Sequence, residues 1–195
     1  MNKKLKLSYN SPVILTFSAV CLAVIILHYI TRGFTTSALF VCYGHPSLLN
    51  PLTYLRAFTY VFGHADFSHF AGNMTMLLLV GPAVEERYGS WNTAIMMFVT
   101  ALAGGILNML FFSTGILGAS GIVFMLIILS AFTNMKKGEI PLTLILIAAI
   151  YLGKELYAGL FVTDNVSHFG HLCGGVSGLG FGTYYFKKKF ELSGK

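Results

Sequence analysis

Hydrophobic residues fall into six long runs along the chain, and short groups of polar and charged residues separate these runs. Runs of this length with few charges are typical of helices that cross a membrane. The predicted helices cover residues 12–30, about 68–84, about 92–112, 120 to about 135, 141 to about 162 and about 166–186. The pattern therefore predicts an all-α integral membrane protein with a six-transmembrane-helix bundle.

The stretch between the first two runs, residues 31–65, is too long for a simple turn. Connections of that length are usually functional when they are ordered. It contains apolar pieces such as Leu48-Leu49 and Tyr60-Val61-Phe62. We therefore expect a structured first loop, with short helices lying in the membrane interface.

Composition agrees with a membrane protein, because only 10% of the 195 residues are charged and 55% are hydrophobic, whereas soluble domains carry about 25% charged residues. The net charge of +6 does not indicate nucleic acid, since the basic residues form short clusters and no long basic face. The expected surroundings are a lipid bilayer. Residues 1–195 are predicted to form a single transmembrane domain, with a core at about 52–188 and cytoplasmic tails at 1–11 and 188–195.

The basic residues predict the orientation. With the N-terminus inside, only Arg32, Arg56 and Lys154 fall on the outer side, and an excess on the inner side indicates that both termini are cytoplasmic. The inner residues are Lys3, Lys4, Lys6, Arg87, Lys136, Lys137, Lys187, Lys188, Lys189 and Lys195. The first run is too long for a signal peptide, so we expect a retained helix. The expected location is a bacterial plasma membrane.

The fourth predicted helix is short. From Ser120 to Met135 it would span about 24 Å, against about 30 Å for the hydrocarbon core. Ser120 would then lie several ångströms below the outer surface, and the approach from Thr114 to Gly118 would dip into the protein. Non-helical backbone at that depth must be buried in protein or line a wet cavity. We expect a sunken site that opens to the outer side.

Ser120 is a candidate nucleophile because Gly118 and Gly121 leave room for a substrate backbone. Serines in membrane helices also bond simply to the carbonyl one turn back. A candidate base is His171, since a histidine inside a span is costly and usually functional. Gly170, Gly174, Gly178 and Gly182 form one helix face that allows a neighbouring helix to approach closely. If that neighbour carries Ser120, hydroxyl and imidazole can meet; alternatively, His171 only supports a helix contact.

His69 and Asn73 are four residues apart, so they share a helix face. Together with the N–H of Ser120, which lacks an intrahelical partner, they are candidate donors to an oxyanion. The alternative is a buried His–Asn pair that ties helices together. No carboxylate is expected to complete a triad, because Asp164 lies about two turns from His171 and Asp66 suits a helix N-cap. His168 is expected at the membrane interface. We therefore expect a Ser–His dyad.

Several motifs on successive spans resemble the rhomboid family of intramembrane serine proteases, over about Arg56 to Phe186. They are Gly118-Ala119-Ser120-Gly121, His69-x-x-x-Asn73 preceded by His64, Glu85…Gly89-Ser90, and His171-Leu172-x-Gly174-x-x-x-Gly178. The resemblance implies a six-helix bundle, a Ser120–His171 dyad and an oxyanion hole from the Ser120 N–H, His69 and Asn73, with Gly118 beside it. It also implies cleavage of single-span transmembrane protein substrates near their outer end, with no metal and no cofactor.

The chain departs from the family pattern in two places. Leu55-Arg56 stands where the family often has Trp-Arg, before the second span. Phe124 stands where some members have a tyrosine that packs on the histidine; it can stack, but it offers no hydroxyl. His64 and Phe124 are expected to support the site. By the family pattern, the fifth helix moves to admit substrate.

Two rival functions follow from the same residues. A metal-dependent membrane protease would use His64, His69, His168 and His171, but the chain has no His-Glu-x-x-His motif and no carboxylate is expected near them. A non-cleaving rhomboid-like protein, a binder of membrane segments or a transporter, would also need buried polar residues and a glycine face. The chain lacks the inverted halves of many transporters.

Overall fold

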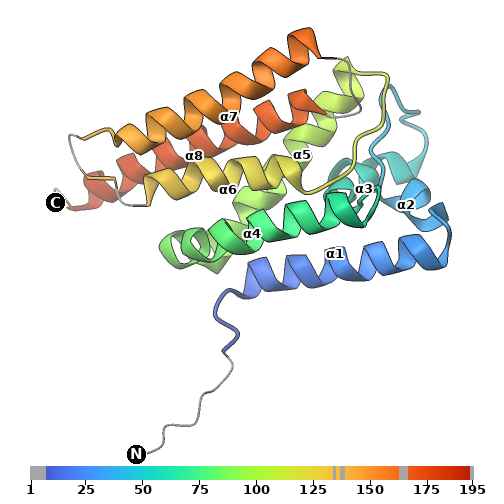
Figure 1. Ribbon diagram of the computed structural model, residues 1–195, viewed down its shortest axis with the longest axis horizontal. Coiled ribbons are helices and arrows are strands. Elements are labelled where there is room, and N and C mark those ends of the chain that lie inside the picture. The colour runs from blue at the N-terminus through green and yellow to red at the C-terminus, as the bar shows by residue number, and fades with distance from the viewer. Residues whose placement is uncertain (1–7, 134, 137–138, 163–166, 194–195) are drawn as a thin grey trace, which may run out of the picture.

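The computed structural model describes residues 8–133, 135–136, 139–162 and 167–193, which form a bundle of helices (Figure 1). The predicted tails fall partly outside this range, at residues 1–7 and 194–195, as does Asp164. The elements are α1 (Pro12–Ile30), α2 (Phe34–Leu39), α3 (Pro51–Thr59), the 3₁₀ turn η1 (Tyr60–Phe62), α4 (Phe67–Tyr88), α5 (Ser90–Phe111), α6 (Ser120–Phe132), α7 (Leu142–Phe161) and α8 (His168–Ser193).

Among the described residues, four helices are long and apolar enough to cross a membrane, namely α1, α4, α5 and α7. Helix α6 is apolar but has only 13 residues, or about 20 Å of helix. Helix α8 is long, yet its glycines and histidines keep it below the apolar character of those four. The helical character and the short helix at Ser120 are confirmed, whereas a count of six spans remains a prediction.

Two helices end at residues other than the approximate ends predicted. Helix α6 ends at Phe132, where the Thr133 N–H donates to the Ser130 carbonyl at 3.2 Å and tightens the last turn. Helix α8 continues to Ser193, past the lysines that were expected to stop it. Lysine is a good helix former, so a lysine cluster ends an apolar run without ending the helix.

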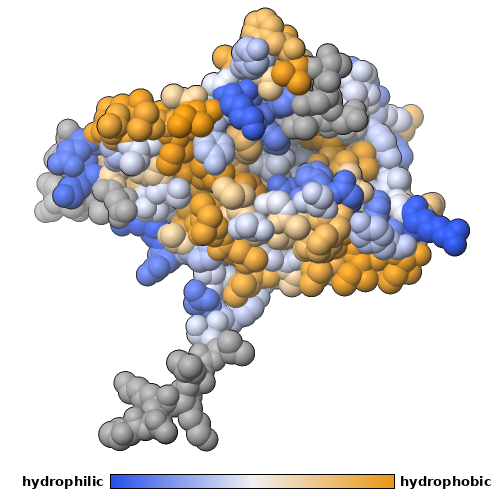
Figure 2. All heavy atoms as spheres, in the orientation of Figure 1, coloured by the Kyte–Doolittle hydropathy of each residue, from blue (hydrophilic) through white to orange (hydrophobic). Residues whose placement is uncertain are grey.

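Helix α6 lies at the centre of the bundle, between α4 and α8, with α1 beyond α4 and α7 beyond α8 (Figure 1). Its Met125, Leu126 and Ile128 side chains are fully buried. The outer helices instead expose large hydrophobic side chains, and patches of them cover much of the visible face (Figure 2). Water would not stabilise such a surface, but lipid chains would.

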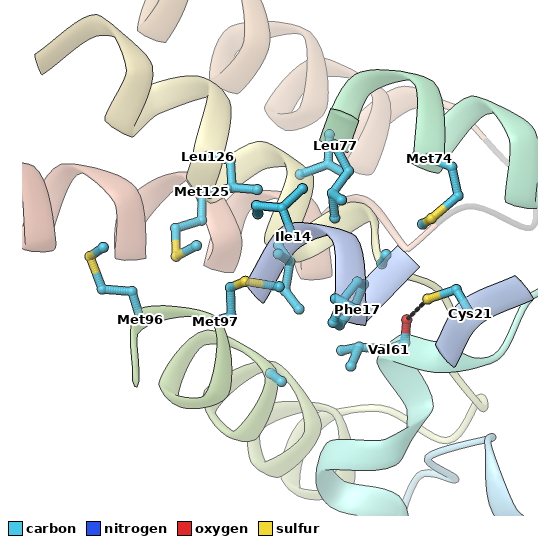
Figure 3. Close-up of a cluster of buried hydrophobic side chains, with 14 of the residues drawn as sticks. Ile14, Phe17, Cys21, Val61, Met74, Leu77, Met96, Met97, Met125 and Leu126 are labelled. Atoms are coloured by element: carbon cyan, nitrogen blue, oxygen red, sulfur yellow. Dashed lines mark hydrogen bonds between the residues drawn. The ribbon is translucent and has the colours of Figure 1, made fainter. Parts of the chain in front are cut away.

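The main core joins α1, α4, α5 and α6 (Figure 3). Ile14, Leu77, Met96 and Leu126 have no exposed surface. Cys21 is buried among them as a small hydrophobic residue, and its thiol points to the Val61 carbonyl at 4.0 Å. Methionine is well suited to fill the irregular gaps between these helices.

Glu85 closes the end of the bundle opposite Ser120. It is only 3% exposed. Its carboxylate accepts from the N–H groups of Val13 and Ile14, each at 3.0 Å, and from the Ser90 hydroxyl at 2.7 Å. A negative charge at a helix start is stabilising. Glu85 therefore ties the beginning of α1 to the turn between α4 and α5.

The first loop is structured, as predicted, because α2, α3 and η1 lie within residues 31–65. Arg56 holds these short helices together by donating to the Ala38 carbonyl from Nε at 2.8 Å and from Nη2 at 2.6 Å. The Thr59 hydroxyl donates to the Leu39 carbonyl at 2.6 Å. Arg56 therefore anchors the loop although the residue before it is Leu55.

Candidate active site

The first loop holds the segment that leads to Ser120. Cys42 and Ile116 exchange two backbone hydrogen bonds of 2.9 Å, and the Gly118 N–H donates to the Tyr60 carbonyl at 3.0 Å. Ile116, Gly118 and Ala119 are buried in the protein, whereas the depth of this segment in the membrane remains a prediction. These contacts fix Ser120 as the first residue of α6, where its N–H has no partner within the helix.

Gly118 makes the turn that brings the chain to Ser120. Its φ of +119° is a conformation that favours glycine. A Cβ at this position would lie 2.8 Å from His69 Nε2 and 3.6 Å from Asn73 Nδ2. The structure thus brings together the three residues predicted to surround an oxyanion, immediately before Ser120.

Asn73 has an unused hydrogen-bond donor. Its side chain is 8% exposed, and its Nδ2 is buried without a hydrogen-bond partner among the described residues. Buried amide groups are nearly always paired, so an unpaired one needs an explanation.

Asp66 fixes the start of α4, the helix that carries His69 and Asn73. Its carboxylate accepts a hydrogen bond from the His69 N–H at 2.8 Å, which confirms the predicted N-cap.

His64 supports His69 from behind. The two rings make an edge contact with centroids 5.1 Å apart, and His64 Nδ1 lies 3.2 Å from the Phe62 carbonyl. His64 is fully buried in the segment before α4, and burial lowers its pKa to about 4. A neutral His64 ring therefore packs against His69.

Helices α6 and α8 approach closely enough for their backbones to touch. A Cβ on Gly174 would overlap the carbonyl oxygen of Gly121, and one on Gly178 would lie 2.7 Å from the Met125 carbonyl oxygen. The predicted glycine face is therefore the contact surface with α6. The contact of Gly121 with Gly174 places the regions of Ser120 and His171 beside each other.

The His171 ring is held on two sides. Phe124, one turn after Ser120 on α6, stacks on it with centroids 4.5 Å apart and an interplanar angle of 8°. His171 Nδ1 lies 2.9 Å from Glu155 Oε2. Among the described residues, no hydrogen bond joins Ser120 to His171. In the absence of substrate such bonds are often long, and they tighten in the complex.

The expectation that no carboxylate is near His171 was wrong. Glu155 of α7 is 4% exposed, and its Oε2 also lies 2.7 Å from His168 Nδ1. His168 is thus part of this group and not simply an interface residue. Sequence reasoning missed the pairing because it depends on how α7 packs against α8. A lone acidic residue in an apolar helix was the available signal, since such residues are usually functional.

The same three residues form a set of metal-ligand atoms. Glu155, His168 and His171 place one ligand atom each within 4.8 Å of one another. Two ligands of a tetrahedral zinc ion would lie about 3.3 Å apart, whereas the two nitrogen–oxygen distances are 2.7 and 2.9 Å. The geometry is that of hydrogen bonds, and His64 and His69 are not in the set.

The chain is similar to known proteins over much of its length. Residues 51–188 match the sequence model of the Rhomboid domain. The chain is 33% identical to RHOMBOID-like protein 1 of Arabidopsis thaliana over 136 residues, which cover 65% of this chain and 33% of the relative. It is 28% identical to Rhomboid protease GluP of Bacillus subtilis (strain 168) over 174 residues, covering 84% of this chain and 33% of the relative.

A third relative, Rhomboid-related protein 2 of Mus musculus, is 29% identical over 161 residues, covering 71% of this chain and 53% of the relative. The chain thus spans about a third to about half of the length of these relatives.

Proposed function

Since this chain belongs to the rhomboid family, we propose that it is an intramembrane serine endopeptidase that cleaves single-span membrane proteins near the outer membrane face. One observation supports this proposal most strongly. Within the part of the chain that the structure describes, the buried Asn73 amide nitrogen has no hydrogen-bond partner, and it lies next to Gly118, two residues before Ser120. A donor left free beside a candidate nucleophile is what oxyanion stabilisation requires. A protein that only binds membrane segments has no such need.

The proposed reaction is acyl transfer. Nε2 of His171 takes the proton from the Ser120 hydroxyl as the Ser120 oxygen attacks the peptide carbonyl. The Ser120 N–H, Asn73 and His69 donate to the resulting oxyanion. The tetrahedral intermediate collapses, His171 passes its proton to the leaving amine, and an acyl-enzyme remains. Water then attacks the ester, with His171 as base, and releases the carboxylic acid product and free Ser120.

The relatives support this reaction to different degrees. The Bacillus relative is itself named a protease, and its alignment covers 84% of this chain. The Arabidopsis and mouse relatives are named only for the family. The proposal therefore rests on the site of this chain together with the family, and it includes both termini in the cytoplasm and a site open to the outer side.

The test is cleavage of a single-span substrate by purified protein in liposomes. We expect no cleavage by Ser120→Ala. Asn73→Ala should lose about 10²–10³ in kcat, the usual effect of removing one oxyanion donor. Asn92→Ala is the control: it removes a side-chain amide at the start of α5, where Nδ2 of Asn92 donates to the Tyr88 carbonyl, and it should retain activity. Equal activity of Asn73→Ala and wild type would remove Asn73 from the site.

Two further arms of this experiment address the rival functions. A metal-dependent protease would lose activity in a strong chelator, whereas the proposed enzyme should retain it. A non-cleaving binder would capture membrane segments equally well as wild type and as Ser120→Ala, and neither would produce fragments.

A further inference from the structure

Near the end of α7, two histidine side chains lie within hydrogen-bond distance of the same carboxylate oxygen. Glu155 Oε2 lies 2.7 Å from His168 Nδ1 and 2.9 Å from His171 Nδ1. An ionised carboxylate can only accept hydrogen bonds. Each Nδ1 must therefore carry the hydrogen, which leaves Nε2 of His171 without one. In this tautomer, Nε2 can act as a base.

We propose that Glu155 is a positioning residue for His171: it holds the ring with Nδ1 protonated and Nε2 directed away from α7, and it stabilises the imidazolium that forms during catalysis. This inference rests on the proposed function. It replaces the expected Ser120–His171 dyad with a Ser120–His171–Glu155 relay in which Glu155 does not touch the substrate.

The packing around His171 leaves the ring little freedom. The parallel stack on Phe124, with centroids 4.5 Å apart, fixes the plane of the ring. The bond to Glu155 fixes which edge faces α7. Helices α7 and α8 are close at this level, because a Cβ on Gly159 would lie 3.4 Å from His168 Cβ. Gly159 is one turn after Glu155, so this approach keeps the carboxylate within reach of both rings.

His168 stabilises the carboxylate. Burial of a lone charge is costly unless hydrogen bonds compensate for it, and Glu155 is only 4% exposed. With two N–H donors on one oxygen, Glu155 keeps its charge in this environment. His168 and His171 are three residues apart on α8, so they reach the same oxygen from one helix face.

The proton balance of the relay is simple. The proton of the Ser120 hydroxyl moves to His171 Nε2 as the Ser120 oxygen bonds to the carbonyl carbon. The Nδ1 hydrogen stays on the ring and continues to donate to Glu155, which remains ionised throughout. The same Nε2 proton then leaves with the amine product.

The test combines kinetics with nitrogen NMR of the purified full chain. Glu155→Gln should lower kcat for substrate cleavage by about 10²-fold with little change in KM, since Glu155 acts through His171 and does not touch the substrate. Glu155→Asp, which keeps the charge on a shorter side chain, should recover part of that loss. Glu85→Gln is the matched control, because Glu85 is also a buried carboxylate but accepts its hydrogen bonds from the start of α1 and from Ser90. It should lower the melting temperature and leave kcat unchanged.

Nitrogen NMR of histidine-labelled wild type should show His171 protonated at Nδ1 and not at Nε2. This measurement does not depend on a variant that folds. Wild-type kcat in Glu155→Gln while Ser120→Ala is inactive would overturn the relay and leave the dyad and the proposed function in place. An Nε2-protonated His171 in wild type would also overturn it. If wild type cleaves nothing, the proposed function fails instead, and NMR still tests the tautomer.

Discussion

Gly118 sets the geometry of the candidate site at the level of one residue. Replacement by alanine would strain a backbone with a φ of +119° and push a methyl group toward His69. We expect Gly118→Ala to lose about 10² or more in cleavage rate, because the oxyanion donors would be displaced. Gly72→Ala is the control, since this exposed glycine next to Asn73 has open space around it. Equal rates for the two variants would show that Gly118 does not position the donors.

His64 predicts a pH dependence of stability. Its pKa is lowered by burial from 6.5 to about 4, so between these values the unfolded chain binds a proton that the folded protein does not. Stability therefore falls as pH falls through this window. His64→Phe keeps an aromatic ring and removes the titration. Its melting temperature should drop less between pH 7 and pH 5 than that of wild type, by a few °C. An identical drop in both proteins would contradict the assigned burial effect.

Sequence patterns were informative about individual residues wherever the signal was local. His69 with Asn73, and the glycines at intervals of four in α8, each lie within one segment, so spacing alone predicted their shared faces. Glu155 was missed because its partners lie 13 and 16 residues away, on the next helix. Only the packing of α7 on α8 reveals that contact.

At the level of helices, the glycine face of α8 determines how closely α6 approaches. A side chain at Gly174 would strike the Gly121 backbone, whereas Gly180 on the same helix has no neighbour within 4 Å. Gly174→Val should therefore separate α6 from α8, lower the melting temperature by several °C and abolish cleavage, because Ser120 and His171 lie on these two helices. Gly180→Val should behave like wild type. Normal cleavage by Gly174→Val would show that the close approach is unnecessary.

Helix positions were predicted more accurately than helix ends. Periodic apolar runs located α1, α4, α5, α6 and α7, but the run alone does not tell where hydrogen bonding stops. The lysines near the end of α8 lie beyond the apolar run, but the helix continues through them. The short helices of the first loop were expected only in general terms, because their bounds depend on contacts such as that of Arg56 with the Ala38 carbonyl.

For the whole molecule, the apolar exterior and the basic residues together predict one orientation. Leu49 in the first loop is 96% exposed, and Tyr9 before α1 is 64% exposed. If the first loop is outside, an impermeant maleimide should label Leu49→Cys in intact cells and Tyr9→Cys only after lysis. Wild type, whose three cysteines are at most partly exposed, is the control. Labelling of Tyr9→Cys in intact cells would show that the protein has the opposite orientation in the membrane.

The central claim is that the fold activates Ser120. The most direct measurement is labelling of the purified, detergent-solubilised protein with a serine-reactive fluorophosphonate, for wild type, Ser120→Ala and His171→Ala side by side. Labelling needs a nucleophilic hydroxyl and its base, but no physiological substrate. We predict that wild type reacts and that neither variant does. Labelling of Ser120→Ala to the same extent as wild type, or no labelling of folded wild type by two classes of serine probe, would contradict the claim.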